Sequence, residues 1–123
     1  ETEGGTAAGG ELADLAGALR ARVDRLVEVT GLLVGLGASD PVAMLANATA
    51  YLEATGHVVI AWMWLEQLLA LGGRTADPSD TFAAGKLQAA RYFLRWELPS
   101  VDAQLDLLAS GDRTTLDMDP DWF

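Results

Sequence analysis

The stretch from Asp40 to Gly72 limits what this chain can fold into more than any other part of the sequence. The Asp40 side chain can accept hydrogen bonds from the first free backbone N–H groups of a helix, and Pro41 suits the first helical position. Gly72 can end a helix because glycine readily adopts left-handed backbone angles. The simplest interpretation is one long helix over the whole stretch.

Apolar side chains point in all directions around this expected helix. A surface helix shows an apolar stripe of about 100° and a polar opposite face. Here no charged residue occurs between Glu53 and Glu66. The helix must therefore be covered on several sides, and the other segments are expected to cover part of it. Its large apolar residues are Val58, Val59, Ile60, Trp62, Met63, Trp64 and Leu65.

A helix is predicted before this stretch, from Glu11 to about Leu36. Its inward positions recur at alternating steps of three and four residues, which is the period of a helix packed along a bundle. These positions are Leu12, Leu15, Leu19, Val23, Leu26, Thr30 and Leu33.

A third helix is predicted after the loop that follows Gly72. Ser79 or Asp80 can cap its first turn. Pro99 cannot donate the next helical hydrogen bond, so we expect a kink or a new helix there, which then continues to Gly111. Its inward side carries Phe82, Leu87, Ala90, Phe93 or Leu94, and Glu97.

The sequence therefore predicts an all-α fold, an antiparallel bundle of three long helices with the third kinked or split at Pro99. The bundle is expected to occupy residues 11–111. Residues 1–10 are rich in glycine and are interpreted as a flexible linker, with a further segment encoded upstream of them. The acidic tail at residues 112–123 is expected to dock through its terminal aromatic residues, Trp122 and Phe123.

The formal net charge of −10 at pH 7, with only eight Lys and Arg residues, limits the possible partners. Binding to nucleic acid or to anionic lipid depends on cationic side chains, so both are disfavoured. The uncharged run from Ala54 to Leu65 is shorter than the roughly 20 residues of a membrane span. The chain has no cysteine, which excludes a disulfide framework and is compatible with the cytoplasmic location that we expect.

His57 is the only histidine and the first candidate for chemistry. Glu53 lies four residues earlier on the same helical face and could orient its ring. Catalysis or metal binding needs further partners, and a di-iron site of the Glu-x-x-His kind would need a second histidine. A structural, hydrogen-bonded role is favoured. The sequence points to no catalytic, cofactor-binding or metal-binding residue.

Three tryptophans, Trp62, Trp64 and Trp96, could line a ligand groove. Core packing or a protein interface explains them without a ligand, because burying one large apolar side chain contributes roughly 1.5–3 kcal/mol. Trp62 and Trp64 lie about 200° apart around a helix, so at least one should meet a different surface.

Arg91 and Arg95 lie one helical turn apart and could together bind a phosphate or carboxylate. In a chain with excess negative charge, an ion pair with Glu97 or with another helix carboxylate is favoured. The candidate interface or groove therefore comprises His57, Trp62, Trp64, Arg91, Arg95, Trp96, Trp122 and Phe123.

Three blocks of the sequence resemble a known family. They are GHVVIAWMWL at residues 56–65, GKLQAARYFLRWELP at residues 85–99 and DMDPDWF at residues 117–123. They closely resemble the extra C-terminal domain of a branch of flavin-dependent acyl-CoA dehydrogenases, the branch that includes methylmercaptopropionyl-CoA dehydrogenases. The similarity covers the chain from about Pro41 to its end, and the first predicted helix only by pattern.

The resemblance implies an all-α accessory domain attached to a dehydrogenase body. Enzymes of this family use FAD to remove hydrogens from the α and β carbons of an acyl-CoA thioester, with a glutamate as base and an electron-transfer flavoprotein as the usual acceptor. No catalytic or FAD-binding motif of the family maps onto a residue of this sequence.

The resemblance thus implies a domain that is inactive alone and packs on the catalytic body of its parent or on a neighbouring subunit of a homo-oligomer. The alternative is a self-standing helical module whose aromatic groove binds an acyl chain or a partner helix.

Overall fold

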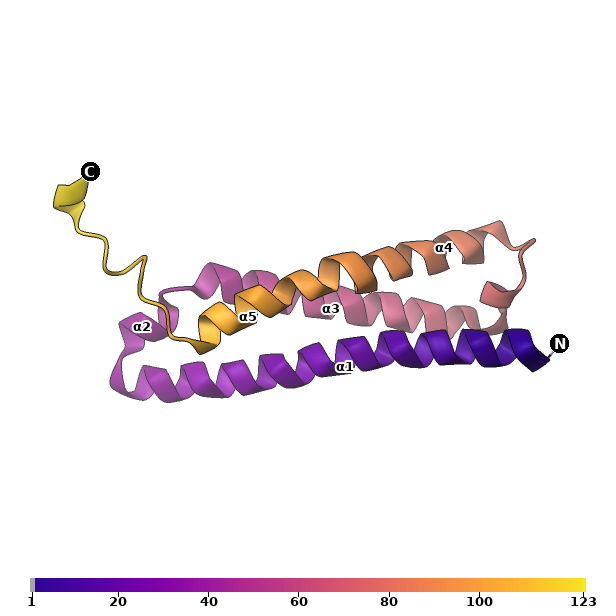
Figure 1. Ribbon diagram of the computed structural model, residues 1–123, viewed down its shortest axis with the longest axis horizontal. Coiled ribbons are helices and arrows are strands. Elements are labelled where there is room, and N and C mark those ends of the chain that lie inside the picture. Colours follow the sequence, from indigo (N-terminus) through magenta and orange to yellow (C-terminus); the bar gives the residue numbers. More distant parts are fainter. Residues whose placement is uncertain (1) are drawn as a thin grey trace.

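The computed structural model describes the backbone of residues 2–123 and the side chains of residues 9–123. Three long helical segments run side by side in an up-down-up bundle (Figure 1). No strand occurs in the described residues. The prediction of an all-α antiparallel bundle is therefore confirmed. The long segments are α1 (Thr2–Ser39), α3 (Ala48–Leu71), and α4 (Thr81–Tyr92) continued by α5 (Val101–Ala109).

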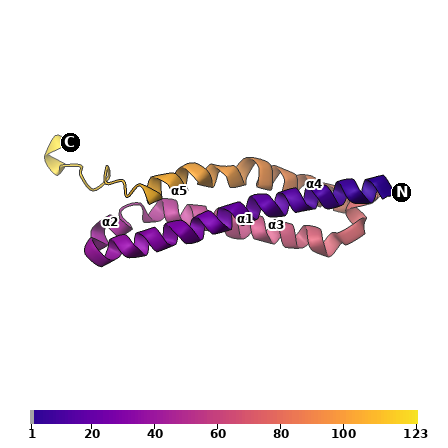
Figure 2. The ribbon, with the colours of Figure 1, turned by 60° about the horizontal axis from the view of Figure 1, so that its bottom comes forward.

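Short helical turns complete the chain. The helix α2 (Pro41–Leu45) follows α1, and the 3-10 turn η1 (Gly72–Ala76) follows α3. Between α4 and α5 the chain forms a π-helical turn, η2 (Phe93–Glu97), and a 3-10 turn, η3 (Leu98–Ser100). A last turn, η4 (Pro120–Trp122), lies in the C-terminal tail, which leaves the bundle beside α2 and points away from it (Figures 1 and 2).

The first helix is longer than the sequence predicts. A flexible linker was expected at residues 1–10 and a helix from Glu11, whereas α1 begins at Thr2; Glu1 lies outside the described residues. Each glycine costs about 1 kcal/mol relative to alanine, but a residue added to an existing helix gains a backbone hydrogen bond. Residues 2–10 are therefore helical rather than a linker.

The structure divides the helix that was predicted over residues 40–72, and the break lies at Asn47. The Asn47 Nδ2 group donates a hydrogen bond to the Asp112 carbonyl oxygen at 2.9 Å, which ties the break to the start of the tail. The break also turns α2 onto α1, where a Cβ atom at Gly37 would lie 2.3 Å from the Met44 sulfur. The prediction of a single helix here was wrong, because α2 gains these contacts by turning.

The predicted helix ends at Asp40, Gly72 and Gly111 are confirmed. Asp40 caps α2 by accepting a hydrogen bond from the Ala43 backbone N–H at 3.1 Å. Gly72 and Gly111 end α3 and α5 with φ angles of +54° and +67°, which other residue types rarely adopt.

The π-helical turn keeps the buried stripe of the third segment continuous past Pro99. Two four-residue steps follow one another, from Ala90 to Leu94 and from Leu94 to Leu98, and together they exceed the period of 3.6 residues. The wider π turn absorbs the extra residue. The prediction of a third helix kinked or split at Pro99 is therefore confirmed, because the chain passes Pro99 through a π turn and a 3-10 turn. The buried stripe consists of Ala83, Ala90, Leu94, Leu98, Val101, Leu105 and Leu108.

Small residues allow α3 to approach the other two segments. Ala54 and Ala61 on α3 and Ala90 on α4 are fully buried.

Ion pairs connect α1 to the third segment. Arg22 on α1 donates two hydrogen bonds to Asp102 on α5, at 3.2 and 3.0 Å. One turn further along, Arg25 Nη2 donates to Asp106 Oδ1 at 3.0 Å, and these contacts fix the parallel register of α1 and the third segment.

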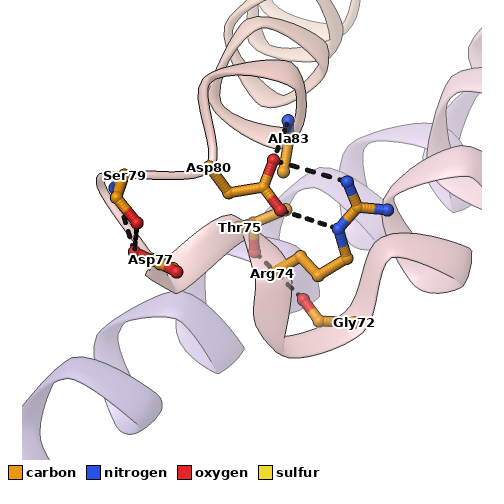
Figure 3. A network of polar contacts seen from close by, with 7 residues as sticks. All are labelled: Gly72, Arg74, Thr75, Asp77, Ser79, Asp80 and Ala83. Atoms are coloured by element: carbon orange, nitrogen blue, oxygen red, sulfur yellow. Dashed lines mark hydrogen bonds and ion pairs between the residues drawn. The ribbon is translucent and has the colours of Figure 1, made fainter.

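Side-chain contacts hold the turn between α3 and α4 (Figure 3). Arg74 Nε donates to Asp80 Oδ2 at 2.7 Å, and Asp80 Oδ1 caps α4 by accepting from the Ala83 N–H at 3.1 Å. Ser79 donates two hydrogen bonds to Asp77. The Arg74 side chain lowers the pKa of Asp80, and the Ser79 hydroxyl lowers the pKa of Asp77. Asp80, one of the two predicted candidates, is therefore the cap.

One stretch, Ala48–Ala76, is long and apolar enough to cross a membrane by length and composition, and 22% of its most apolar window is buried. The central helix of a globular protein can meet the same criteria. The part between Glu53 and Glu66 is about 20 Å long, shorter than the hydrocarbon core of about 30 Å. The finding marks α3 as an apolar helix with much exposed surface.

Candidate protein interface

One side of α3 is apolar and exposed to solvent. Its residues are large, and Leu52 is 72% exposed and Val59 42%. We call this surface the outer face. Isolated exposed apolar residues are common on proteins, whereas a contiguous patch marks an interaction site. The outer face consists of Leu52, Val59, Ile60, Trp62 and Met63.

The opposite side of the same helix lies in the core, and we call it the inner face. Its residues lie four, three and seven positions apart, which places them on one side of a helix. Val58 is only 5% exposed although it directly precedes Val59. The inner face consists of Ala54, Val58, Ala61 and Leu68.

The tryptophans do not share one groove. Trp64 is partly buried against the core, and the Lys86 Nζ atom lies 5.5 Å from the centroid of its ring, in a cation–π arrangement. Trp62 belongs to the outer face, and Trp96 is exposed on η2. The structure therefore directs Trp62 and Trp64 to different surfaces.

His57 lies between α3 and the π-helical turn. Its Nδ1 atom is 3.0 Å from the Glu53 carbonyl oxygen, and its Nε2 atom is 3.4 Å from Glu97 Oε2. The ring stacks on Phe93 at 5.8 Å between centroids. Tyr92 donates a hydrogen bond to Glu97 Oε1 at 3.0 Å, and this bond raises the pKa of Tyr92. These contacts join the two helices and give His57 the hydrogen-bonded role that its sequence context favours.

Arg91 and Arg95 both bind Glu11 of α1. Arg91 donates from Nη2 to Glu11 Oε2 at 2.8 Å and also from Nε to Oε1, while Arg95 Nη2 donates to Oε1 at 3.1 Å. The hydrogen bond from Arg91 lowers the pKa of Glu11. Of the two partners considered from sequence, another helix carboxylate is the one used, since Glu97 faces His57.

Trp122 and Phe123 do not dock on this chain, contrary to the expectation for the tail. They are 71% and 96% exposed. The pair of Arg113 with Asp40 at 2.8 Å fixes the base of the tail at the α2 end, from which the later residues point outward (Figure 1).

A cleft of about 520 Å³ lies at the other end of the bundle, between α1, the end of α3, η1 and α4. We call it the leucine cleft. Glu11 and Arg91 lie on it, and Arg91 is the one candidate residue from the sequence that it contains. A second cavity, of about 210 Å³, lies between α1, α2 and α3. The apolar wall of the leucine cleft consists of Leu12, Leu15, Leu68, Leu69 and Leu87.

The leucine cleft does not fit a flavin. Its charged groups, Glu11 and Arg91, already pair with each other, whereas a flavin pyrophosphate needs free N–H donors. Among the described residues, no group of three His, Asp or Glu side chains could hold a metal ion.

A comparison with protein families assigns the chain. The family model described as "Acetyl-CoA dehydrogenase C-terminal like" matches residues 2–119. The chain belongs to this family. No curated protein and no solved structure matches it. The family match confirms the resemblance to acyl-CoA dehydrogenase C-terminal domains and extends it to α1.

Sequence reasoning missed two features of this acyl-CoA dehydrogenase C-terminal-like domain. The leucines of the cleft come from three helices, and in the sequence they are typical core positions. Glu11 was not identified as the partner of Arg91, which lies 80 residues away. These groups come together only because of how α1 is aligned with α4. This alignment cannot be predicted from a local sequence pattern.

Proposed function

We propose that this chain is a non-catalytic accessory domain of an FAD-dependent acyl-CoA dehydrogenase. In this proposal the outer face of α3 packs against the catalytic body of that enzyme or against a neighbouring subunit of a homo-oligomer. The observation that carries the proposal is the exposure of five large apolar side chains on one side of α3, Leu52, Val59, Ile60, Trp62 and Met63.

The composition of the outer face favours a protein partner. Aromatic residues and methionine are enriched in the cores of protein interfaces, and charged residues are depleted there. The outer face contains both residue types, and no charged residue interrupts α3 between Glu53 and Glu66. Its short uncharged length and the net charge of −10 argue against a lipid bilayer as the partner.

The chemistry belongs, in this proposal, to the catalytic body. FAD, the glutamate base and the site for an electron-transfer flavoprotein are placed there, and the enzyme is placed in the cytoplasm and in fatty acid metabolism. The charged side chains of this domain serve its own packing instead, as in the contacts of His57 with Glu97 and of Arg91 with Glu11. The domain then affects turnover only through assembly.

The first test concerns parentage. The natural polypeptide that carries this domain is captured with an antibody, and its mass and flavin absorption are measured. We expect a polypeptide several times heavier than 13.0 kDa that carries flavin. A flavin-free polypeptide of about 13 kDa would contradict the proposal.

The second test concerns the outer face in that natural polypeptide. Val59→Glu places a charge on the outer face, and Val27→Glu places the same charge on an exposed valine of α1. We expect Val59→Glu to lower the melting temperature and to shift the oligomer to smaller species, and Val27→Glu to change neither. Equal behaviour of the two variants would contradict the assembly role.

A further inference from the structure

We propose that the C-terminal tail of one copy of this chain docks into the leucine cleft of a second copy. The tail offers Met118, Trp122 and Phe123, all exposed, and the cleft offers an apolar wall of five leucines. This self-association goes beyond the function proposed above and does not depend on the outer face of α3.

The tip of the tail forms a hydrogen-bonded turn although it stands away from the bundle. Asp119 Oδ1 accepts a hydrogen bond from the Asp121 N–H at 2.9 Å, and Pro120 occupies the first position of the η4 turn. Among the described residues, no hydrogen bond or ion pair joins residues 118–123 to a helix. A segment that is already folded loses less conformational entropy when it binds. The turn thus presents Trp122 in a form suited to docking.

The size and lining of the leucine cleft suit such an occupant. Its volume of about 520 Å³ falls within the range of about 300–1,000 Å³ that is typical of sites for small ligands. An aromatic side chain buries about 150–250 Å² and gains most from an apolar pocket. Leu69, at its mouth, is 59% exposed, so docking would cover apolar surface that the chain itself leaves open.

The tail is acidic, and one lysine beside the cleft can pair with it. The tail carries Asp117, Asp119 and Asp121, and no Lys or Arg follows Arg113. The charged residues in the lining of the cleft, Glu11 and Arg91, pair with each other. Arg74 of η1 pairs with Asp80, which leaves Lys86 of α4 as the cation beside the cleft that can receive a carboxylate.

Lys86 is the cation best placed to receive a tail carboxylate. Its Nζ atom lies over the rings of Trp64 and Phe82, and no carboxylate of the described side chains is within ion-pair distance. Lys86 also directly precedes Leu87, which lines the cleft.

The smaller cavity near the base of the tail is the weaker receptor. Its volume is about 210 Å³, and its lining contains no charged residue. It therefore offers neither the space for an aromatic pair nor a partner for the tail carboxylates.

The tail cannot reach the leucine cleft of its own bundle. Among the described residues, its last hydrogen bond to the bundle runs from Thr115 Oγ1 to the Ala46 carbonyl oxygen, at 3.5 Å. Beyond Thr115, the residues to Phe123 span at most about 29 Å when fully extended, and the η4 turn shortens this. Leu68 lies about 30 Å along α3 from Ala48, and the tail would first have to reverse its direction. Only a second copy can supply the cleft.

A two-fold arrangement satisfies both copies at once. The tail leaves one end of the bundle, and the turn between α3 and α4 lies at the other end (Figures 1 and 2). The residues that line the cleft include those of this turn, Gly72, Gly73, Thr75 and Ala76. When two bundles lie antiparallel, the tail end of each is beside the cleft end of the other, and a two-fold interface closes without leaving a free site.

Cysteine cross-linking tests the contact directly, because the chain has no cysteine of its own. The variant Phe123→Cys is mixed with isotope-labelled Leu69→Cys under mild oxidation, and the mixed disulfide is quantified by mass spectrometry. The control mixture replaces Leu69→Cys by Leu32→Cys, an exposed leucine of α1 outside both cavities. We expect at least tenfold more mixed disulfide with Leu69→Cys. Equal yields in the two mixtures would overturn the proposal.

Sedimentation equilibrium of the unmodified chain and of two serine variants gives an independent test. We expect a reversible dimer whose dissociation constant rises at least tenfold in Trp122→Ser, since buried tryptophans are frequent hot spots. Trp96→Ser, which removes another exposed tryptophan, should leave the constant unchanged. A chain that stays monomeric, or equal effects of the two variants, would overturn the proposal.

Discussion

The inner and outer faces of α3 belong to one helix and differ in what covers them. Both are apolar, and the neighbours Val58 and Val59 illustrate the contrast, with 5% and 42% exposure. The inner face uses small residues such as Ala54 and Ala61, which let the other helices approach. The outer face uses large ones such as Trp62 and Met63. Small residues allow close packing of helices within the bundle, and large residues are suited to packing against another protein surface.

This contrast explains why α3 has no polar side. A helix that is apolar all round is buried in its final environment, and this bundle covers only one side of α3. The inner face should therefore determine the stability of the isolated chain, and the outer face its association.

The largest effect is expected when a charge is placed on each face in turn. Val58→Asp buries an unpaired carboxylate and should destabilise the isolated chain by about 3 kcal/mol or more, enough to unfold it or nearly so. Val59→Asp should change the stability by less than about 0.5 kcal/mol. Urea unfolding followed by Trp fluorescence measures both. Similar losses would show that the two faces are not distinct.

Truncating a leucine on each face should give the next largest difference. Leu68→Ala removes a buried side chain and should cost about 2–3 kcal/mol, whereas Leu52→Ala, at an exposed position, should cost less than about 0.5 kcal/mol. Both replacements lie in α3 and make the same chemical change. If Leu52→Ala lowered the stability as much as Leu68→Ala, the inner and outer faces would not differ in their contribution to folding.

The ion pairs of Glu11 connect α1 to α4 and so help to close the bundle over the inner face. Glu11→Gln should cost about 1 kcal/mol at pH 7, because Arg91 and Arg95 lose a shared carboxylate. Glu66→Gln, which removes an exposed glutamate of α3, should have little effect. Equal losses for the two variants would show that the Glu11 pairs contribute nothing specific.

The same pair predicts a dependence on pH. Arg91 lowers the pKa of Glu11 in the folded chain, so the unfolded chain binds more protons in acid. The contribution of the pair is complete above the unfolded pKa of about 4.3 and is lost as the pH falls through the lower folded pKa. Urea midpoints at pH 6 and pH 3 should therefore differ less in Glu11→Gln than in the unaltered chain. An unchanged difference would contradict this assignment.

The smallest effects concern two threonines, Thr30 on α1 and Thr55 on α3. Thr30 Oγ1 lies 2.7 Å from the Tyr51 hydroxyl oxygen, and Thr30→Val should cost about 1 kcal/mol. The buried Thr55 Oγ1 has no hydrogen-bond partner among the described residues, so Thr55→Val should be neutral or slightly stabilising, within about 0.5 kcal/mol. Thermal unfolding distinguishes the two, and a larger loss for Thr55→Val would contradict the assignment.

The sequence predicted the helices better than their exact faces. Periodicity placed Leu15 and Leu19 in the core, but it chose Val23, which is exposed, and it passed over Val29, which is fully buried. Between Leu19 and Val29, the inward position of α1 is occupied by Arg22. The aliphatic part of its side chain packs there while its guanidinium group binds Asp102. A pattern based on hydrophobicity alone cannot select an arginine for such a position.

The candidate site was predictable only in part. The apolar character all round α3 predicted that part of this helix stays uncovered by the bundle, and Leu52, Trp62 and Met63 are exposed. The break at Asn47 depends on a contact with the tail. The π turn at Phe93–Glu97 depends on packing against neighbouring helices. The leucine cleft depends on the register of helices far apart in sequence. Such tertiary effects leave no local pattern.

The most direct test of the account measures how accessible the outer face is in the natural polypeptide. Hydroxyl-radical footprinting gives the oxidation rates of Trp62 and Met63, first in the isolated chain and then in the natural polypeptide. The account predicts fast oxidation in the isolated chain and at least fivefold slower oxidation in the natural polypeptide. Equal rates in both would show that nothing covers the outer face and would contradict its role as an interface.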